Sequence, residues 1–590
     1  MYLANLKLWN YRKFGSDGDI YNDSPDLNVD FHEGLNLLIG ENDSGKTAII
    51  DAIKMVLKTS SNDWIRLDED DFYKESQELR IELLLSGFSD NEASHFTEYL
   101  TTKFVDGKPE HKLKLIFTAT RADNKIKTKD IRAGEDVGHV VLAEARDYLK
   151  STYLKPLRDA RSELIPKRNS RLSQIFSEHE AFKSHESHLL LKVYNEFNET
   201  IEAYFDGKNR DGEILIEDQN GKALKSSIDG TISQFFEAST TSTLKTASAQ
   251  MKKVLESLEL SLVDVENPGL GSLNRLFMAS ELIHLNKNDW SGLKLGLVEE
   301  IEAHLHPQVQ LKVIKSLLSF EKTQLLLTTH SPNLASQVPL KNQIICRNNN
   351  AFPMGSKYTN LSEDQYIFLD KFLDVTRSSL FFARGLILVE GWSEELLIPI
   401  IADRIGYNLI DHEVTVINVS NLGFENYYKI FSRTDDKDMG IKISVITDCD
   451  FAAYEEIIVD SGKVYYEVDK KEYLEGCENA AKMIEEKYNG VVQAYVAREW
   501  TLEWCLMKSE VLRNLFLEVA KTVHTKGAWI TEPEKQLAEK LLKKTLNKSE
   551  IAYQMLKKLN EDKQNLDLSK LKNDPSMKHI FEAIKNACTR

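Results

Sequence analysis

The chain of 590 residues lacks any long hydrophobic run, and no stretch reaches the roughly 18 apolar residues that a membrane helix needs. Its first residues, Met1 to Trp9, also lack the basic region followed by an apolar segment that marks a secretory signal. Internal repeats and low-complexity segments are missing too. We therefore expect a cytoplasmic protein with no membrane partner, long enough for two to four globular domains.

Cysteine is scarce and scattered. The five cysteines form neither a paired framework nor a CxxC metal knuckle; they stand at positions 346, 449, 477, 505 and 588. This excludes a disulfide-stapled fold and fits a reducing compartment.

Positive charge is also in short supply, since the net charge is −17. This argues against a protein that wraps nucleic acid over its whole surface. Bound divalent cations would nevertheless invert the field around a carboxylate cluster. Two short basic segments, Lys155 to Arg161 and Lys167-Arg168, could hold phosphates or could be ordinary solvated faces.

One motif near the start of the chain indicates a nucleotide site. The segment from Gly40 to Thr47 fits the pattern GxxxxGK[ST], between an apolar strand at 35–39 and a helical pattern at 46–58. Such a loop points backbone N–H groups at phosphates, its lysine reaches the β- and γ-phosphates and its Ser or Thr binds Mg²⁺. The predicted nucleotide-binding residues of this loop are Gly40, Asn42, Ser44, Gly45, Lys46 and Thr47.

Three later segments fit the same nucleotide site. A strand at 295–298 ends in Glu299, which would hold Mg²⁺ through water, and Glu300, which could polarise the attacking water. His330 follows a strand at 324–328 and could sense the γ-phosphate. Ser272 lies in a glycine turn that opens a helix and could contact the nucleotide from across a dimer.

A rival interpretation of this region is a zinc site. His304 and His306 are two residues apart, but no other cluster of metal ligands is nearby in the sequence.

These segments, in this order, are similar to ABC-type ATPases of the SMC-like class. Asn10 to Phe14 resembles the N-terminal region of that class, and Asp70 to Tyr73 resembles its Q-loop. The sequence departs from the class at two points, because Glu299 stands where most members have Asp and the Gly271-Ser272 turn matches LSGGQ only in part. Both departures weaken the case for fast hydrolysis. The long coiled coil of the DNA-repair relatives is absent.

The C-terminal half alternates strands and helices, which predicts a parallel α/β sheet. A strand at 386–389 ends in Glu390, and a strand at 443–447 is followed by Asp448 and Asp450. Because side chains of a strand alternate, we expect Asp448 and Asp450 to point the same way. Carboxylates at the carboxyl ends of parallel strands form a site for hard cations. Glu394, one helical turn after Glu390, and Glu503 are further candidate ligands; each acid taken alone could be a helix cap or surface charge.

The strand-Glu-Gly and Asp-x-Asp pattern resembles a Toprim domain. A topoisomerase would need a separate DNA-gate domain with a nucleophilic tyrosine, and a primase would want a zinc-binding region; the sequence shows neither. An ABC-type ATPase followed by a Toprim domain is the order of the OLD (overcoming lysogenization defect) nuclease family, and 381–394 is especially similar. The resemblance implies an active-site lysine, with Lys548 as the candidate and Lys526 as its rival.

The resemblance therefore implies a multidomain α/β fold with these parts: an ATPase at 1–150 and 261–375, a helical dimerisation insertion at 151–260, a Toprim nuclease at 376–510 and a helical C-terminal region at 511–590. It implies a DNA endonuclease controlled by ATP, with two Mg²⁺ or Mn²⁺ ions at the Toprim site and one Mg²⁺ with the nucleotide. It also implies bacterial defence against phage, with a partner defence protein or a retron nucleic acid as possible partners.

Two other functions remain open. The chain could be an ATP-switched DNA-binding clamp or repair protein with a regulatory Toprim domain, or a topoisomerase-like strand-passage enzyme. The insertion should form a homodimer or higher oligomer, because its apolar side chains exceed what a thin insertion can bury; the alternative is packing on its own ATPase lobe. The side chains concerned are Tyr194, Phe197, Ile201, Tyr204 and Phe205. We also predict a strand at 213–216 within the insertion.

Overall fold

The computed structural model describes the whole chain except residues 17, 60–65, 106–107, 123–124, 135–137, 155–162, 183–187, 237–239, 245–249, 266, 286–291, 304, 321, 374–376, 421, 460–461, 489, 562–565 and 590. The basic residues predicted at 155–161 and His304 lie outside the described residues. The chain forms two compact units. The first comprises Met1–Leu6, His32–Leu35 and Ile49–Leu327; the second comprises Lys7–Phe31, Asn36–Ala48 and Thr328–Arg590.

The first unit contains an antiparallel sheet built on two long strands. β4 (Glu78–Ser86) pairs antiparallel with β6 (Lys108–Ala122). β5 (Thr101–Val105), β7 (Lys125–Thr128) and β8 (Arg132–Ala133) also pair with β6, and β9 (His139–Val140) pairs with β8. A second group of strands is parallel: β10 (Thr152–Leu154), β11 (Leu295–Val298) and β12 (Gln324–Thr329). The short helices α2 (Asp90–Ser94) and α3 (Ala143–Asp147) complete this lobe.

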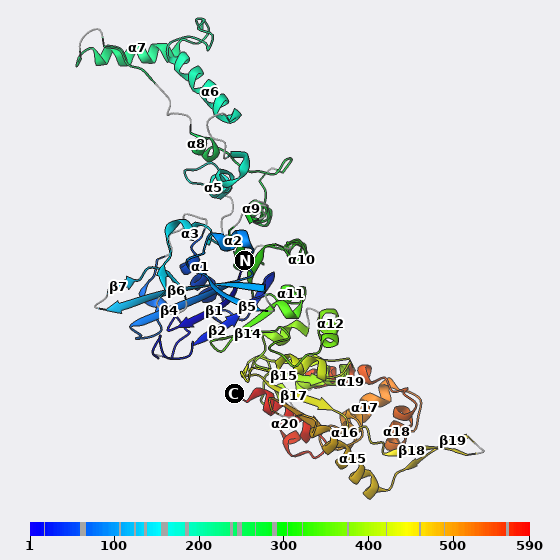
Figure 1. Cartoon of the computed structure of the whole chain (residues 1–590). Coiled ribbons are helices and arrows are strands. Elements are labelled where there is room, and N and C mark those ends of the chain that lie inside the picture. Colours follow the sequence, from blue (N-terminus) through cyan, green and yellow to red (C-terminus); the bar gives the residue numbers. More distant parts are fainter. Residues whose placement is uncertain are drawn as a thin grey trace. The chain divides into compact units, whose positions relative to one another are not determined.

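Helices dominate the rest of this unit (Figure 1). They are α5 (Arg171–Glu178), α6 (Leu189–Phe205), α7 (Asn220–Ile232), α8 (Met251–Glu256), α9 (Leu270–Leu285) and α10 (Pro307–Leu318). The strand predicted at 213–216 is wrong. Ile214 makes only an isolated bridge to Lys208, and Ile214 and Ile216 are exposed, so no neighbouring strand or core supports an extended segment there.

The second unit contains the strands that carry the phosphate loop. β3 (Leu35–Ile39) pairs in parallel with β13 (Gln343–Arg347), and β13 forms a hairpin with β14 (Asn350–Pro353). Asn348 and Asn349 both adopt a left-handed conformation at the hairpin turn, which asparagine tolerates well. β3 leads to α1 (Lys46–Leu57), and both agree with the sequence prediction. Other elements of the ATPase segments are β1 (Tyr2–Trp9), β2 (Leu27–Asp30), α11 (Pro332–Ala335) and α12 (Glu363–Phe372).

A four-stranded parallel sheet follows, in the order β16-β15-β17-β20. Its strands are β15 (Gly385–Val389), β16 (Val414–Asn418), β17 (Lys442–Thr447) and β20 (Val492–Val496). Between them lie α13 (Trp392–Arg404), the short α14 (Glu425–Tyr428), the hairpin of β18 (Tyr454–Val459) with β19 (Gly462–Glu467), and α15 (Lys470–Glu485). The alternating α/β pattern predicted from the sequence is confirmed.

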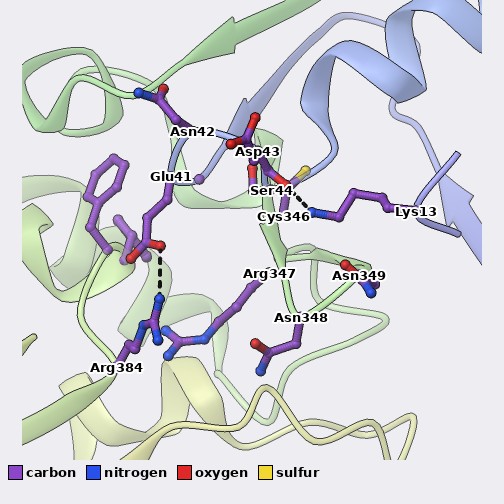
Figure 2. Close-up of a pocket in the computed structure, with 13 residues that line it drawn as sticks. Lys13, Glu41, Asn42, Asp43, Ser44, Cys346, Arg347, Asn348, Asn349 and Arg384 are labelled. Carbon is purple, nitrogen blue, oxygen red and sulfur yellow. Dashed lines mark hydrogen bonds and ion pairs between the residues drawn. The ribbon is translucent and has the colours of Figure 1, made fainter. Parts of the chain in front are cut away.

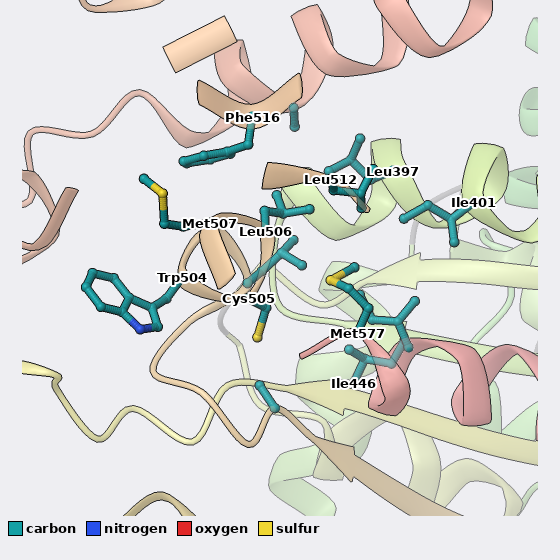
Figure 3. Close-up of a cluster of buried hydrophobic side chains, with 14 of the residues drawn as sticks. Leu397, Ile401, Ile446, Trp504, Cys505, Leu506, Met507, Leu512, Phe516 and Met577 are labelled. Atoms are coloured by element: carbon teal, nitrogen blue, oxygen red, sulfur yellow. The ribbon is translucent and has the colours of Figure 1, made fainter. Parts of the chain in front are cut away.

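The C-terminal helices pack on this sheet through one continuous hydrophobic core (Figure 3). The helices are α16 (Leu502–Lys508), α17 (Arg513–Val523), α18 (Pro533–Leu542), α19 (Lys548–Glu561) and α20 (Lys578–Cys588). α20 approaches the sheet very closely, because a Cβ on Gly385 would lie 2.2 Å from the carbonyl oxygen of Ala587. Ser444 Oγ also donates to the Ala583 carbonyl at 2.8 Å. Helix α20 is therefore part of the same folded body as β15 and β17.

Among the described helices, none is both long and apolar enough to cross a bilayer. All five cysteines are buried and unbridged. The α/β multidomain fold is confirmed, whereas the five domain boundaries stay predictions.

Candidate functional site

The phosphate loop joins β3 to α1 with the geometry that its glycines require. Gly45 has φ +103°, and a Cβ there would lie 2.5 Å from the ring of Phe14. Lys46 is 8% exposed and donates from Nζ to the carbonyl oxygens of Gly40 and Glu41, each at 2.7 Å. It also donates to Ser44 Oγ at 3.3 Å. A nucleotide that took the lysine amine would have to replace these three acceptors with phosphate oxygens.

A cavity of about 280 Å³ opens beside this loop (Figure 2). Glu41 to Ser44 line it together with Lys13, Arg347 and Arg384. Arg384 Nη2 lies 3.7 Å from Glu41 Oε2, and its Nε pairs with Glu413. Burial lowers the pKa of Arg347, which keeps its positive charge at neutral pH. The cavity therefore brings cationic side chains next to a loop suited to phosphates.

The other predicted nucleotide residues stand where the sequence places them relative to their strands and helices. Glu299 directly follows β11 and is 7% exposed. Glu300 is exposed and has φ 46°, the left-handed region. Ser272 lies in the first turn of α9, where its Oγ accepts from Arg275 at 3.0 Å, and His330 directly follows β12 and is exposed. Glu299, Glu300 and Ser272 belong to the first unit, whereas the phosphate loop and His330 belong to the second.

Four acidic side chains lie around the carboxyl ends of the parallel sheet. Glu390 follows β15, and Glu394 lies in the first turn of α13. Asp448 follows β17, and Glu503 lies in the first turn of α16, where it is 2% exposed. Each of these acids directly follows a strand or lies in the first turn of a helix. The alternation of strands and helices therefore determines where they lie.

The charges of these carboxylates act on one another. Burial and the charge of Glu503 raise the pKa of Glu394 to about 7. Burial, Glu503 and Glu394 also raise the pKa of Asp448 well above its usual value. Burial raises the pKa of Glu390, and the charge of Asp450 adds to that increase. Such mutual repulsion in a buried cluster calls for positive charge.

Part of that positive charge comes from Lys548, the first residue of α19. Its Nζ lies 2.8 Å from Glu503 Oε2. Burial opposes the charged lysine, but Glu503 and Asp448 raise its pKa overall. Lys526, the rival candidate, is exposed in a loop between α17 and α18. The structure thus brings Lys548 to the carboxylates, as the family resemblance implied, while its catalytic role stays a prediction.

One argument from the sequence is wrong. β17 ends at Thr447, so strand alternation does not govern Asp448 and Asp450. Asp450 has φ 56°, is exposed, and donates its N–H to the Trp500 carbonyl at 3.2 Å. The turn carries Asp450 out of the strand, although its charge still acts on Glu390.

Sequence reasoning also missed the hydroxyl groups that hold the acids. Thr447 donates to Glu390 Oε1, and Thr501 Oγ1 donates to Glu503 Oε2 at 3.1 Å. Ser393 Oγ donates to Glu503 Oε1 at 3.4 Å. The available signal was that each hydroxyl residue lies within two positions of an acid, since Thr447 precedes Asp448, Ser393 precedes Glu394 and Thr501 stands two residues before Glu503.

The donor set suits a hard divalent cation, which prefers carboxylate oxygens. Among the described residues, no three His, Cys, Asp or Glu side chains already stand close enough together to enclose an ion. Glu503 is instead paired with Lys548 and Thr501, and Glu390 accepts from Thr447. Burial, and to a lesser extent the neighbouring carboxylates, raise the pKa values of Glu390, Glu394 and Asp448. A bound cation would stabilise the charged forms of these three side chains, so they suit such an ion.

A phosphate loop followed by a parallel sheet with acids at its carboxyl edge defines an ATPase joined to a Toprim-type domain. The family model for the AAA ATPase domain matches residues 1–335, and the chain belongs to that family. The model for the overcoming lysogenization defect protein-like TOPRIM domain matches residues 381–450. The resemblance to the OLD family found in the sequence is thereby confirmed. These domains imply use of a nucleotide and a divalent metal.

Two relatives share much of this arrangement. Endonuclease GajA of Bacillus cereus (strain HuB5-5) is 21% identical, over 95% of this chain and 96% of that protein. The retron Ec83 probable ATPase of Escherichia coli is 24% identical, over 59% of this chain and 72% of that protein.

Two solved structures are similar in part. An SmcHead bound to the C-winged helix domain of ScpA covers 60% of this chain and 96% of its own, with 16% identity and a TM-score of 0.33. The C-terminal region of the Burkholderia pseudomallei OLD protein covers 35% of this chain and 100% of its own, with 23% identity and a TM-score of 0.23.

Proposed function

We propose that this protein is a DNA endonuclease of OLD type that depends on divalent metal and is controlled by ATP. The observation that carries the proposal is the acidic cluster at the carboxyl edge of the parallel sheet, with Lys548 beside Glu503 at 2.8 Å. A lysine from a segment far along the chain is not expected in an ordinary surface cluster of acids. It is expected in a site that cleaves phosphodiesters, because negative charge grows on the phosphate in the transition state and a lysine stabilises it.

The residues divide into two tasks. Glu390, Asp448 and Asp450 would hold the metal ions, with Glu394 and Glu503 as further ligands. When bound, two divalent ions would activate the attacking water and stabilise the leaving oxygen. Lys548 would neutralise charge on a non-bridging phosphate oxygen. The hydroxyl groups of Thr447 and Thr501 fix the orientation of Glu390 and Glu503. Mg²⁺ or Mn²⁺ would serve, with two ions here and one with ATP.

Plasmid cleavage tests the nuclease assignment. Asp448→Asn and Glu390→Gln should lower the rate of nicking or linearisation in Mg²⁺ or Mn²⁺ by at least about 10²-fold, while ATP binding survives. Asp411→Asn, an exposed acid in the loop before β16, is the matched control and should cut normally. Cleavage at the wild-type rate by either site variant would reject the assignment.

The same plasmid experiment separates the alternative functions. Metal-dependent DNA binding without any cutting by the wild type would favour the clamp instead, and relaxed closed circles would favour a topoisomerase.

The nucleotide residues are tested separately. Lys46→Ala should weaken ATP binding, because its Nζ supplies charge to the β- and γ-phosphates. Glu300→Gln should bind ATP and hydrolyse it more slowly if Glu300 orients the water. Gly40, Asn42, Ser44, Gly45 and Thr47 complete the proposed cradle, and Glu299, Ser272 and His330 complete the proposed hydrolytic site. Equal hydrolysis by Glu300→Gln and wild type would assign the water to another residue.

The relatives suggest a biological setting. GajA is an endonuclease and the retron Ec83 relative is a probable ATPase, so we propose an anti-phage defence effector that acts with a partner defence protein or a retron nucleic acid. Phage plating on cells that carry the gene in its natural neighbourhood would test this setting, and protection that persists in Asp448→Asn would contradict it.

We also propose a homodimer or higher oligomer formed through residues 151–260.

A further inference from the structure

Trp392 is unusual among the tryptophans of this protein. Its side chain is 62% exposed, whereas Trp9, Trp500, Trp504 and Trp529 are at most 8% exposed. These are all the tryptophans within the described residues. An indole carries one of the largest apolar surfaces of any side chain, so leaving it in water forgoes much hydrophobic stabilisation. Such exposure is expected where a bound molecule covers the ring.

The position of Trp392 indicates which molecule that is. It is the first residue of α13, two residues after Glu390 and two before Glu394. Consecutive Cα atoms are 3.8 Å apart, so its Cα lies within about 7.6 Å of the Cα atoms of both acids. A molecule that covers the indole therefore lies close to the segment that carries both acids, to which the proposed function brings DNA.

Other aromatic rings border the same cluster. Tyr428 and Tyr488 form an edge-to-face pair with ring centroids 5.5 Å apart. Burial raises the pKa of Tyr488 to about 12, and the charges of Tyr428 and Glu390 add to that increase. The surroundings of the cluster thus offer flat ring faces as well as charge. A nucleobase has a flat face that stacks on such rings, and it carries no charge for the carboxylates to repel.

Base pairs inside a duplex are already stacked on both faces. A base can lie on an exposed indole only if it is unpaired, belongs to the terminal pair of a duplex, borders a gap, or is turned out of the helix. On the basis of the proposed function, we propose that Trp392 stacks on an unpaired nucleobase next to the scissile phosphate. The substrates preferred by this nuclease are then single-stranded DNA and DNA that is single-stranded or distorted at the cut. Stacking of this kind contributes about 1–3 kcal/mol per base, or roughly 5- to 150-fold in affinity.

Binding to labelled oligonucleotides tests this directly. A single-stranded oligonucleotide and a blunt duplex of the same sequence are compared in Ca²⁺, which stands in for Mg²⁺ without supporting rapid cleavage. Trp392→Ala should weaken binding of the single strand by about 5- to 150-fold and binding of the duplex by much less. Trp392→Phe should restore much of the loss, because it keeps a flat ring. Tyr21→Ala removes an aromatic side chain of similar exposure, 55%, from the segment between β1 and β2 and should change neither.

Fluorescence gives a second readout that a purely structural role would not move. The single strand should quench tryptophan emission in the wild type, and most of that quenching should be missing in Trp392→Phe. Equal quenching in both proteins, or equal losses of single-strand and duplex binding in Trp392→Ala, would overturn the proposal. Unchanged DNA binding with an altered oligomer in Trp392→Ala would assign the ring to a protein contact and would also overturn it. If the wild type binds and cuts no DNA at all, the proposed function itself fails.

Discussion

At the scale of single residues, the ion pair between Glu503 and Lys548 supplies positive charge to the acidic cluster. Glu503 is 2% exposed, and burying a carboxylate is costly unless it has a partner of opposite charge. The lysine supplies that charge from a residue 45 positions further along the chain, at an Nζ–Oε2 distance of 2.8 Å. The lysine side chain is 45% exposed, so it can also reach a phosphate brought in from solvent.

Replacing Lys548 by Ala should therefore lower the rate of DNA cleavage by about 10²-fold while DNA binding changes only a few-fold, because the charge acts mainly on the transition state. Single-turnover cleavage and equilibrium binding measure the two effects. Lys526→Ala is the matched control and should cut normally. Normal cutting by Lys548→Ala beside a defective Lys526→Ala would transfer the role to Lys526, and normal cutting by both would remove any lysine of this region from the mechanism.

The raised pKa of Glu394 makes stability depend on pH. The folded state holds this proton up to a pKa of about 7, whereas the unfolded state releases it near the ordinary value of 4.5. Without metal, the free energy of unfolding should fall as pH rises from about 4.5 to 7 and then stay low, because the folded state binds the proton more tightly.

Glu394→Gln removes this penalty, since a neutral amide cannot repel Glu503. In EDTA its melting temperature should exceed that of the wild type by about 2 °C at pH 8, and the difference should vanish near pH 4.5. Thermal unfolding in chelator across this pH range is the measurement. Glu510→Gln, an exposed acid that follows α16, controls for loss of one charge. A constant difference at all pH values would mean that packing, not titration, separates the two proteins.

At the scale of elements, strands and helices with regular patterns could be predicted from the sequence, and contacts between distant segments could not. β3, β15 and β17 appear where their continuous apolar runs predict strands, because both faces of a central strand are buried. Helix α1 appears where apolar residues recur at helical spacing. The strand expected at 213–216 had the right residues but no partner strand. The family resemblance, rather than any periodicity, pointed to Lys548, since no local pattern shows that the start of α19 meets α16.

The ion pair between Glu41 and Arg384 links two functional elements. Glu41 belongs to the phosphate loop, and its carbonyl accepts from Lys46 at 2.7 Å. Arg384 directly precedes β15, the strand that ends at Glu390. Nucleotide binding that draws Lys46 away from Glu41 would change this loop at the point where its side chain meets Arg384, 3.7 Å away. We expect the pair to carry part of the control of cleavage by ATP.

Arg384→Ala should bring the ratio of cleavage rates with and without an ATP analogue closer to one. A coupling of 1–3 kcal/mol corresponds to roughly 5- to 150-fold, so the change should be measurable whether ATP activates or restrains the nuclease. Lys341→Ala breaks an exposed ion pair with Glu363 that does not touch the phosphate loop, and it should leave the ratio unchanged. An unaltered ratio in Arg384→Ala would show that control passes through other contacts.

At the scale of the whole molecule, helix α6 presents an apolar face to solvent. Leu189, Val193 and Phe197 recur every four residues and are 70%, 52% and 57% exposed. Residues spaced in this way lie on one side of a helix, and a stripe of this kind usually meets another surface. Tyr194, Ile201, Tyr204 and Phe205, which the sequence also suggested, are half-buried.

Introducing charge on this face should weaken self-association. The double variant Val193→Asp, Phe197→Asp should shift a dimeric or larger wild type toward monomer at micromolar concentration, because each carboxylate would have to be buried in the interface. Light scattering after size-exclusion chromatography gives the mass. Ile410→Asp, at an apolar residue 84% exposed in the loop before β16, is the control. An unchanged mass in the double variant would place the interface elsewhere.

The close packing of α20 on the sheet also bears on when, during its synthesis, the chain can complete the proposed nuclease site. A ribosome makes Glu390, Glu394 and Asp448 first, then Glu503, and only later Lys548 and the helix whose Ala587 presses against Gly385. Until those late segments emerge, the newborn chain has the acids without their lysine, and β15 and β17 without the helix that covers them. From the proposed roles of the acids and of Lys548, we expect the chain to gain nuclease activity only after its last helices have been synthesised.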